Sequence, residues 1–184
     1  GVSQDTDLNL GAVKLGAKEG VRVFVDSVTD DTVQLLGTTT VSGIVDLQGR
    51  DNDAGASVTI PAGTLYAGTT DTTDTWGNYG LSLVTDGDYL VTVTMDRYLT
   101  ASKTWTLAGD TQALPRLKLL GGDVVDPGKI NISDISHIAG QFGTSGDPAS
   151  LSGDVNYDGT VNILDLVLAA GNYEVTSAIY DTTW

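Results

Sequence analysis

The first notable absence in this 184-residue chain is cysteine, which excludes disulfides, thiolate metal sites and a cysteine nucleophile. A single histidine, His137, means that a Ser-His-Asp triad could form around one position only. Glutamate is almost as scarce, because Glu19 and Glu174 are the only two among 24 acidic residues. These shortages leave few groups for general acid–base chemistry and predict a non-catalytic protein.

Basic residues are also few. Nine Lys and Arg residues stand against 24 Asp and Glu residues, which gives a formal net charge of -15. An acidic surface repels polyanions, so we expect no nucleic-acid partner and no attraction to anionic membranes. No apolar run reaches the ~18 residues that a membrane-spanning helix needs. Hydrophobic residues make up 40% of the chain, which is enough for a folded core.

The chain divides into three predicted parts: a leading segment (1–36), a β domain (37–120) and a repeat region (121–184). The leading segment alternates in short apolar bursts such as Val21, Val23 and Val25, which predicts strands. A segment of this length is too short to bury a core alone. Its strands would therefore either complete a neighbouring β module or pair with another chain by strand addition.

The middle part has the pattern of a small β-sandwich. Short alternating segments, for example Tyr89, Val91 and Val93, recur at about 8–12-residue spacing between turn residues. Asp86-Gly87-Asp88 is predicted to form a hairpin turn. The core is expected to include Trp76 and Trp105, with a sugar-stacking platform as the alternative role for these two side chains.

An internal repeat defines the last part. Residues 122–142 align with residues 153–173 at a constant offset of 31 positions. Identical pairs include Asn131 with Asn162, and Asp134 with Asp165. Such repetition indicates one supersecondary unit used twice.

The second copy has the spacing of a calcium loop. From Asp154 to Asp165, oxygen-bearing side chains occupy loop positions 1, 3, 5, 9 and 12, and Gly159 occupies position 6. Calcium takes about six to eight oxygen ligands and needs a sharply turning loop. The predicted ligands are Asp154, Asn156, Asp158, Thr160 through its carbonyl, Asn162 and Asp165. Val161, at position 8, is expected to pair with its counterpart in the other repeat.

The first copy has lost part of this ligand set. Asp123, Asn131 and Asp134 keep positions 1, 9 and 12, while Val125 and Pro127 stand at positions 3 and 5. The neighbouring Asp126 could supply an oxygen if the backbone is rearranged, and the ammonium group of Lys129 weakens the field for a cation. The sequence allows two interpretations of the first loop: a second calcium site, or a loop without metal that is kept for packing.

Each loop should lead into a helix. The predicted inward residues are Ile135, Ile138, Ala139 and Phe142 in the first helix, and Leu166, Ala169, Ala170 and Tyr173 in the second. The second helix is also apolar at Ile163, Leu164, Val167 and Leu168. This second face would pack on the β domain or, as we favour, on a partner protein. His137 is expected to face outward near Ser133 and Ser136, and the tail 175–184 to fold back as a clasp.

The paired loops, with their Gly-Asp-Val and Asn-Ile-x-Asp signatures, resemble a dockerin, a calcium-dependent module that binds cohesins in extracellular assemblies. The β domain resembles the X-module that accompanies some dockerins, and carboxypeptidase-regulatory-like domains. Together these resemblances cover residues 37 to about 174. They imply a mainly β fold: a transthyretin-like or Ig-like β-sandwich followed by a small α module, an EF-hand-like dockerin with two helical repeats.

The resemblance also implies a function. It implies an extracellular or cell-surface protein that binds Ca²⁺ and a cohesin-like partner and takes no part in catalysis. In the family, loop positions 10 and 11 help to set partner specificity. The implied partner-binding residues here are Ile132, Ser133, Ser136, Ile163, Leu164, Val167 and Leu168. The alternative is a subunit of an extracellular filament, in which the leading strands and the apolar helix face join copies of the chain.

Overall fold

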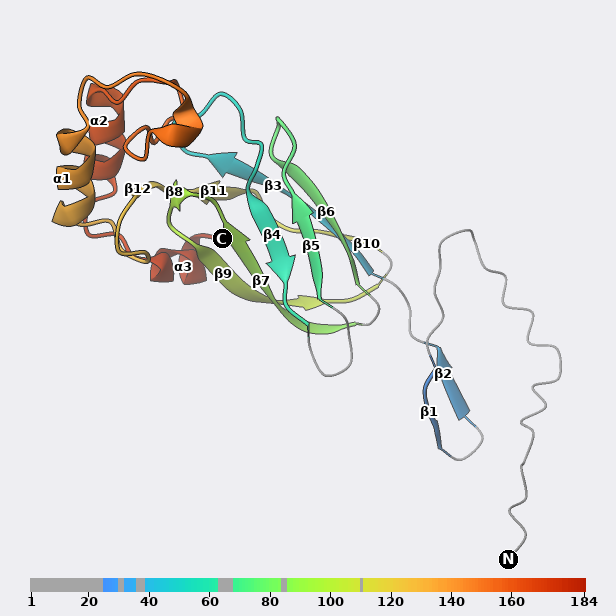
Figure 1. The fold of residues 1–184 in the computed structure, drawn as a ribbon. Helices are drawn as coiled ribbons and strands as arrows, with labels where there is room; N and C mark the ends of the chain where they lie inside the picture. The colour runs from blue at the N-terminus through green and yellow to red at the C-terminus, as the bar shows by residue number, and fades with distance from the viewer. Residues whose placement is uncertain (1–24, 30–31, 36–38, 63–67, 84–85, 110) are drawn as a thin grey trace, which may run out of the picture.

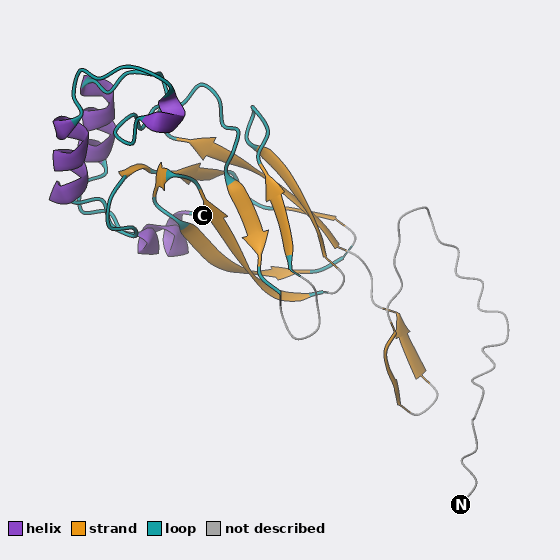
Figure 2. Ribbon diagram, in the orientation of Figure 1, coloured by secondary structure: helices purple, strands orange, loops and turns teal. Residues whose placement is uncertain are grey.

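The computed structural model describes residues 25–29, 32–35, 39–62, 68–83, 86–109 and 111–184 (Figure 1). The described part is mainly β, with two α-helices of nine residues gathered at one end (Figure 2). This confirms the predicted class of a β-rich chain with a small helical module. No helix in these residues has the length and apolar character needed to cross a bilayer.

The leading segment contains one described hairpin. Strand β1 (Val25–Thr29) pairs antiparallel with β2 (Thr32–Leu35), and neither pairs with another described strand. The predicted alternation at Val21 and Val23 lies outside the described residues.

The first sheet is built around β3 (Thr39–Leu47). Strand β6 (Asn78–Leu83) pairs with it antiparallel, whereas β10 (Thr111–Ala113) and β11 (Leu117–Leu119) pair with it in parallel, one after the other. Alternate β3 residues point inward, because Val41, Val45 and Leu47 are fully buried.

The second sheet has the order β5-β4-β7-β9, with all neighbours antiparallel. The strands are β5 (Thr69–Thr72), β4 (Ser57–Ile60), β7 (Gly87–Thr94) and β9 (Ala101–Leu107). Tyr89, Val91 and Val93 on β7 are buried, as the alternation predicted. They form a core with the buried residues of β3, as expected where two sheets pack face to face.

Two local predictions about this sandwich are wrong. The segment at Asp86 is not a hairpin turn, because β6 and β7 belong to different sheets and the chain crosses between them. Trp76 is 75% exposed, since it lies on a turn outside the strands. The carboxylate of Asp74 holds that turn by accepting from the backbone N–H groups of Trp76 and Asn78, both at 2.9 Å.

A short two-stranded sheet connects the sandwich to the helices (Figure 1). Strand β8 (Arg97–Tyr98) pairs antiparallel with β12 (Gly121–Asp123), and β12 contacts both α1 (Ile132–Gly140) and α2 (Ile163–Gly171). A short 3-10 helix, η1 (Pro148–Ser150), lies between the two repeats.

The helices bury a narrower face than the sequence suggested. Ile138 and Ala169 are buried and Ile135 and Leu166 are half-buried, but the other four predicted inward residues are exposed, namely Ala139, Phe142, Ala170 and Tyr173. The helices end at Gly140 and Gly171, so the two aromatic residues follow the last turn and do not share the helix face.

The C-terminal tail packs on the sandwich. It forms η2 (Ser177–Ile179) and α3 (Tyr180–Thr183). The buried hydroxyl of Tyr180 accepts from the backbone N–H of Leu120 at 2.8 Å. Trp184 meets half-buried Trp105 of β9 edge to face, with ring centroids 5.9 Å apart.

Candidate calcium loops and docking face

The two loops share one backbone path despite their different side chains. Position 4 has a left-handed φ in both, at Asp126 (54°) and Tyr157 (62°). Position 6 is a glycine with positive φ in both, Gly128 (110°) and Gly159 (86°). A left-handed backbone favours glycine, which explains why glycine stands at this turn in each copy. The sequence repeat is therefore a structural repeat.

In the second loop, residues 154–165, oxygen-bearing side chains converge. The Asp154 carboxylate is fully buried and accepts from the N–H groups of Asp158 (3.1 Å) and Gly159 (2.9 Å). The Asp158 carboxylate accepts from the side-chain amides of Asn156 (2.8 Å) and Asn162 (3.4 Å). The loop therefore brings the residues at positions 1, 3, 5 and 9 into one cluster.

This cluster favours a cation electrostatically. Burial raises the pKa of Asp154 above its ordinary value, and the carboxylates of Asp165 and Asp158 raise it further, against two backbone hydrogen bonds that lower it. Each effect reflects the free-energy cost of gathering negative charge in a place with little water. A divalent cation among these oxygens would remove that cost, so the donor set fits calcium.

The aspartate at position 12 has a second role. The Oδ1 atom of Asp165 accepts from the N–H groups of Val155 (2.8 Å) and Asn156 (3.1 Å), and Oδ2 accepts from Asn162 (2.9 Å). Asp134 makes the equivalent bonds in the first loop. Both carboxylates therefore close their loops against the backbone, and Oδ2 keeps a lone pair for a cation.

Carboxylates alone do not complete either site. Among the residues that the structure describes, no three His, Cys, Asp or Glu side chains form a group that could hold a metal by themselves. A cation in the second loop would also need the amide oxygens of Asn156 and Asn162 and the carbonyl of Thr160.

The first loop, residues 123–134, offers fewer ligands. Oδ2 of Asp123 accepts from Gly128 N at 2.9 Å, while the buried Oδ1 has no hydrogen-bond partner, which suits a cation ligand. Burial raises the pKa of Asp123. Asp126 is exposed, and the ammonium group of Lys129 forms an ion pair with Glu174. Asn131 caps α1 by accepting from Ser133 N at 2.7 Å.

One predicted contact between the repeats is wrong. Val161 does not pair with Ile130, its counterpart. Its N–H donates to the carbonyl of Thr144, which follows α1, and Ile130 N donates to the carbonyl of Val175, which follows α2. The first loop therefore pairs with the segment that follows α2, and the second loop pairs with the segment that follows α1.

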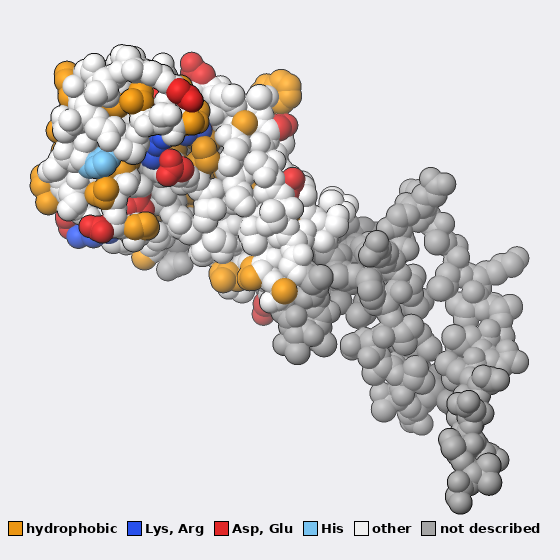
Figure 3. All heavy atoms as spheres, in the orientation of Figure 1, with side chains coloured by type: hydrophobic (Ala, Val, Ile, Leu, Met, Phe, Trp, Pro, Cys, Tyr) orange, Lys and Arg blue, Asp and Glu red, His pale blue; other side chains and the backbone are white. Residues whose placement is uncertain are grey.

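The helices present an exposed apolar strip. The exposed fractions are 62% for Ile132, 59% for Ile163, 54% for Leu164 and 59% for Val167. The flanking Ser133 and Ser136 are exposed too. Figure 3 shows hydrophobic side chains on the surface of this helical end.

The last residue predicted for this face is placed differently. Leu168 is half-buried and packs on the turn after β3, where a Cβ added at Gly49 would lie 2.5 Å from its Cδ1 atom. The apolar face of α2 is therefore divided, with one residue against the sandwich and the rest open.

His137 does not face outward as predicted. It is half-buried, and its Nε2 atom lies 2.8 Å from the hydroxyl of Ser152 and 3.1 Å from the side-chain amide of Gln141. These contacts link α1 to the segment that leads into the second loop.

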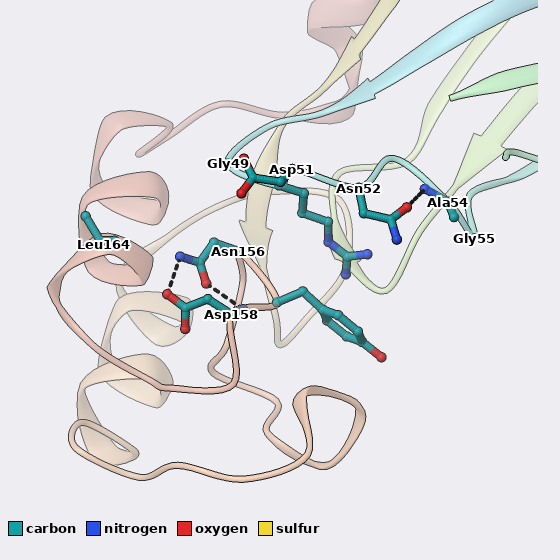
Figure 4. A pocket seen from close by; sticks show the side chains of 10 residues that line it. Gly49, Asp51, Asn52, Ala54, Gly55, Asn156, Asp158 and Leu164 are labelled. Atoms are coloured by element: carbon teal, nitrogen blue, oxygen red, sulfur yellow. Dashed lines mark hydrogen bonds between the residues drawn. The ribbon is translucent and has the colours of Figure 1, made fainter. Parts of the chain in front are cut away.

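No sequence pattern indicated a cavity between the sandwich and the second loop. It has a volume of about 650 Å³ and lies between the turn 49–55 and residues 156–158, with Leu164 at its wall (Figure 4). The Arg50 guanidinium stacks over the Tyr157 ring with 4.2 Å between its carbon and the ring centroid. No motif in the sequence pairs these two residues.

The fold is similar to chains of solved protein complexes. One is the type II cohesin-X-dockerin complex from Acetivibrio cellulolyticus with an N-terminal interface mutation, at 26% identity and a TM-score of 0.67. Another is the same complex with a C-terminal interface mutation, at 25% identity and a TM-score of 0.63. Both matches cover 77% of this chain and 99% of the other. No family model and no curated protein matches the sequence. The likeness supports an X-module/dockerin-related fold.

Proposed function

We propose that this chain is a non-catalytic module of an extracellular or cell-surface assembly, which binds a cohesin-like protein through helices ordered by calcium. The observation that carries the proposal is the open apolar strip on α2, which begins directly at a candidate calcium loop. The likeness to chains of cohesin-X-dockerin complexes supports the same assignment.

The second loop and the docking helix share residues. Asn162 and Asp165 are loop positions 9 and 12, and they are also the N-cap and the third residue of α2. Ile163 and Leu164 lie between them. A cation held by these two side chains would fix the first helical turn and thereby the two exposed apolar residues. Calcium that binds the folded form preferentially also stabilises it by mass action.

When bound, calcium would supply the positive charge that offsets the clustered carboxylates. The second loop would hold it through Asp154, Asn156, Asp158, Thr160, Asn162 and Asp165. A second ion in the first loop would rely on Asp123, Asn131 and Asp134, with Asp126 as the remaining candidate. Because Val125 and Pro127 carry no side-chain oxygen, we expect the first loop to bind calcium more weakly.

The exposed strip has the chemistry of a protein interface. Three α2 side chains are more than half exposed, and a contiguous apolar patch of this kind marks a site of protein–protein interaction. The net charge of -15 disfavours nucleic acid and anionic membranes as partners. The expected partner is therefore a protein with a complementary apolar surface.

The test is calorimetric titration with a panel of purified type II cohesin domains, in calcium and in excess chelator. The account predicts binding in calcium and none in chelator. Leu164→Ser should weaken binding by about tenfold or more, as expected for a central apolar contact. Leu90→Ser is the matched control, because Leu90 is 44% exposed on strand β7 and should leave affinity unchanged.

Two outcomes would contradict the proposal: no binding to any cohesin in calcium, or equal binding by wild type and Leu164→Ser. Concentration-dependent self-association in calcium without cohesin, measured by sedimentation velocity, would instead favour the filament alternative. In that case copies of the chain itself would be the partner.

A further inference from the structure

One residue of the two-stranded sheet that connects the sandwich to the helices, Arg97 on β8, lies against the first residue of both loops. In the β8–β12 pairing, the backbone of Arg97 lies opposite Asp123, which is position 1 of the first loop. The Arg97 side chain extends to the second loop, where Nη1 donates to the backbone carbonyl of Asp154 at 2.7 Å. Asp154 is position 1 of that loop.

Arg97 is held firmly in this place. The residue is only 4% exposed, and its Nη2 atom donates to the carbonyl of Pro148 at 2.9 Å, with Ala149 O at 3.5 Å. Its backbone is in the left-handed region at φ 69°, which costs free energy for a residue with a side chain. The adjacent Tyr98 hydroxyl shares its proton between the carbonyls of Gln48 (3.0 Å) and Val155 (3.1 Å).

Which oxygen of Asp154 accepts the hydrogen bond from Arg97 matters for the binding of a cation. A guanidinium group is always charged, so its electrostatic effect on a nearby calcium site is repulsive. Arg97, however, bonds to the carbonyl of Asp154 and leaves the carboxylate oxygens to the loop's own N–H groups. Position 1 is therefore fixed in space without using the oxygens that a cation needs.

We infer that Arg97 is a positioning residue that couples calcium binding in the second loop to the β-sandwich. This inference rests on the proposed calcium binding. By linkage, a sandwich that holds position 1 in place raises calcium affinity, and calcium in the loop stabilises the sandwich by the same coupling free energy.

The test compares calcium affinity in the full chain by isothermal titration. Arg97→Met should weaken calcium binding by about tenfold, equivalent to about 1.4 kcal/mol. Arg50→Met is the matched control, since it removes a cation stacked on the Tyr157 ring of the same loop and has no hydrogen bond to that loop among those described. The Arg50→Met variant should bind calcium with unchanged or slightly higher affinity. An Arg97→Met variant with unchanged or tighter affinity would overturn the inference, because charge repulsion would then be its main effect.

Melting temperatures with calcium and with chelator separate coupling from a merely structural role. A structural role lowers both temperatures equally, whereas coupling reduces the difference between them. If Arg97→Met does not fold, Arg97→Lys carries the test, since it keeps the charge and loses the forked donor geometry. We then expect the calcium affinity of Arg97→Lys to lie between that of wild type and a value about tenfold weaker.

The outcome also distinguishes the two proposals. A wild-type chain that binds no calcium contradicts the proposed function itself. A wild-type chain that binds calcium, together with Arg97 variants that keep its full affinity and its full calcium-induced shift, contradicts only the role of Arg97.

Discussion

Asp158→Asn is the substitution that examines the second loop with least damage to the fold. The side chain is exposed, so the exchange leaves no cavity. Its Oδ1 atom accepts from Thr160 N at 2.9 Å, and an asparagine oxygen can accept the same bond. The exchange removes one negative charge from the cluster, together with the Oδ2 atom that accepts hydrogen bonds from the side-chain amides of Asn156 and Asn162. The melting temperature of the variant in chelator is therefore the reference for its own calcium-induced shift.

The expected magnitude follows from mass action. With calcium at 100 times its dissociation constant, binding stabilises the folded form by about 2.7 kcal/mol. For a chain of this size, that amounts to an increase of about 5–11 °C in melting temperature. If the lost charge weakens binding about tenfold, the stabilisation falls to about 1.4 kcal/mol at the same calcium concentration, and the shift is halved.

The assay is thermal unfolding followed by circular dichroism, with and without calcium. Asp51→Asn is the matched control, because Asp51 is exposed on the opposite rim of the same cavity and belongs to neither candidate calcium loop. That control should keep the full calcium-induced shift. The reasoning would be refuted if Asp158→Asn kept the full shift, or if both variants lost it equally.

Two further predictions concern the fold around the loops. Gly122→Ala should destabilise the protein by about 1–3 kcal/mol in urea unfolding, because Gly122 has φ +117° and a Cβ there would lie 2.7 Å from Ala169 Cα on α2. Gly140→Ala, which meets no neighbour, should not, and equal losses would contradict the close packing of β12 on α2. Burial raises the pKa of three tyrosines to about 12, namely Tyr79, Tyr98 and Tyr180. Because the folded state holds these protons more tightly, their contribution to stability is complete below pH 10 and is lost as the pH rises through about 12. Ultraviolet titration should show a late ionisation phase near pH 12 in the folded protein that is lost on unfolding, and the absence of this phase would refute the raised pKa values.

The loops could be predicted in detail because their chemistry is local. The spacing of the oxygen-bearing residues and the glycine at position 6 are both contained within twelve residues. The structure places a glycine with positive φ at position 6 of both loops, and it adds a feature that was not predicted, the capping of α1 by Asn131 and of α2 by Asn162. The alternation in β7 was equally readable, since a strand alternates its side chains between two faces.

The errors arise where distant segments decide the outcome. The pairing of Val161 depends on how the two repeats face each other, which no single repeat encodes. Phe142 and Tyr173 were placed on a helix face that ends before reaching them. Trp76 looked like a core residue by type, but a turn held by Asp74 exposes it.

The link between sandwich and loops was not predictable for the same reason. Arg97 lies 57 positions before Asp154 in the sequence, and nothing near it indicates a partner there. Only the fold brings its side chain to the loop carbonyl. The partition of α2, with Leu168 on the sandwich and Leu164 exposed, likewise depends on the position of the turn at Gly49.

The most direct measurement is a crystal structure grown in calcium, with anomalous scattering used to locate the ion. The account predicts a calcium ion enclosed by oxygens of Asp154, Asn156, Asp158, Thr160, Asn162 and Asp165, with α2 ordered from its first turn. A well-resolved map from calcium-saturated crystals with no anomalous signal inside that loop would contradict the account.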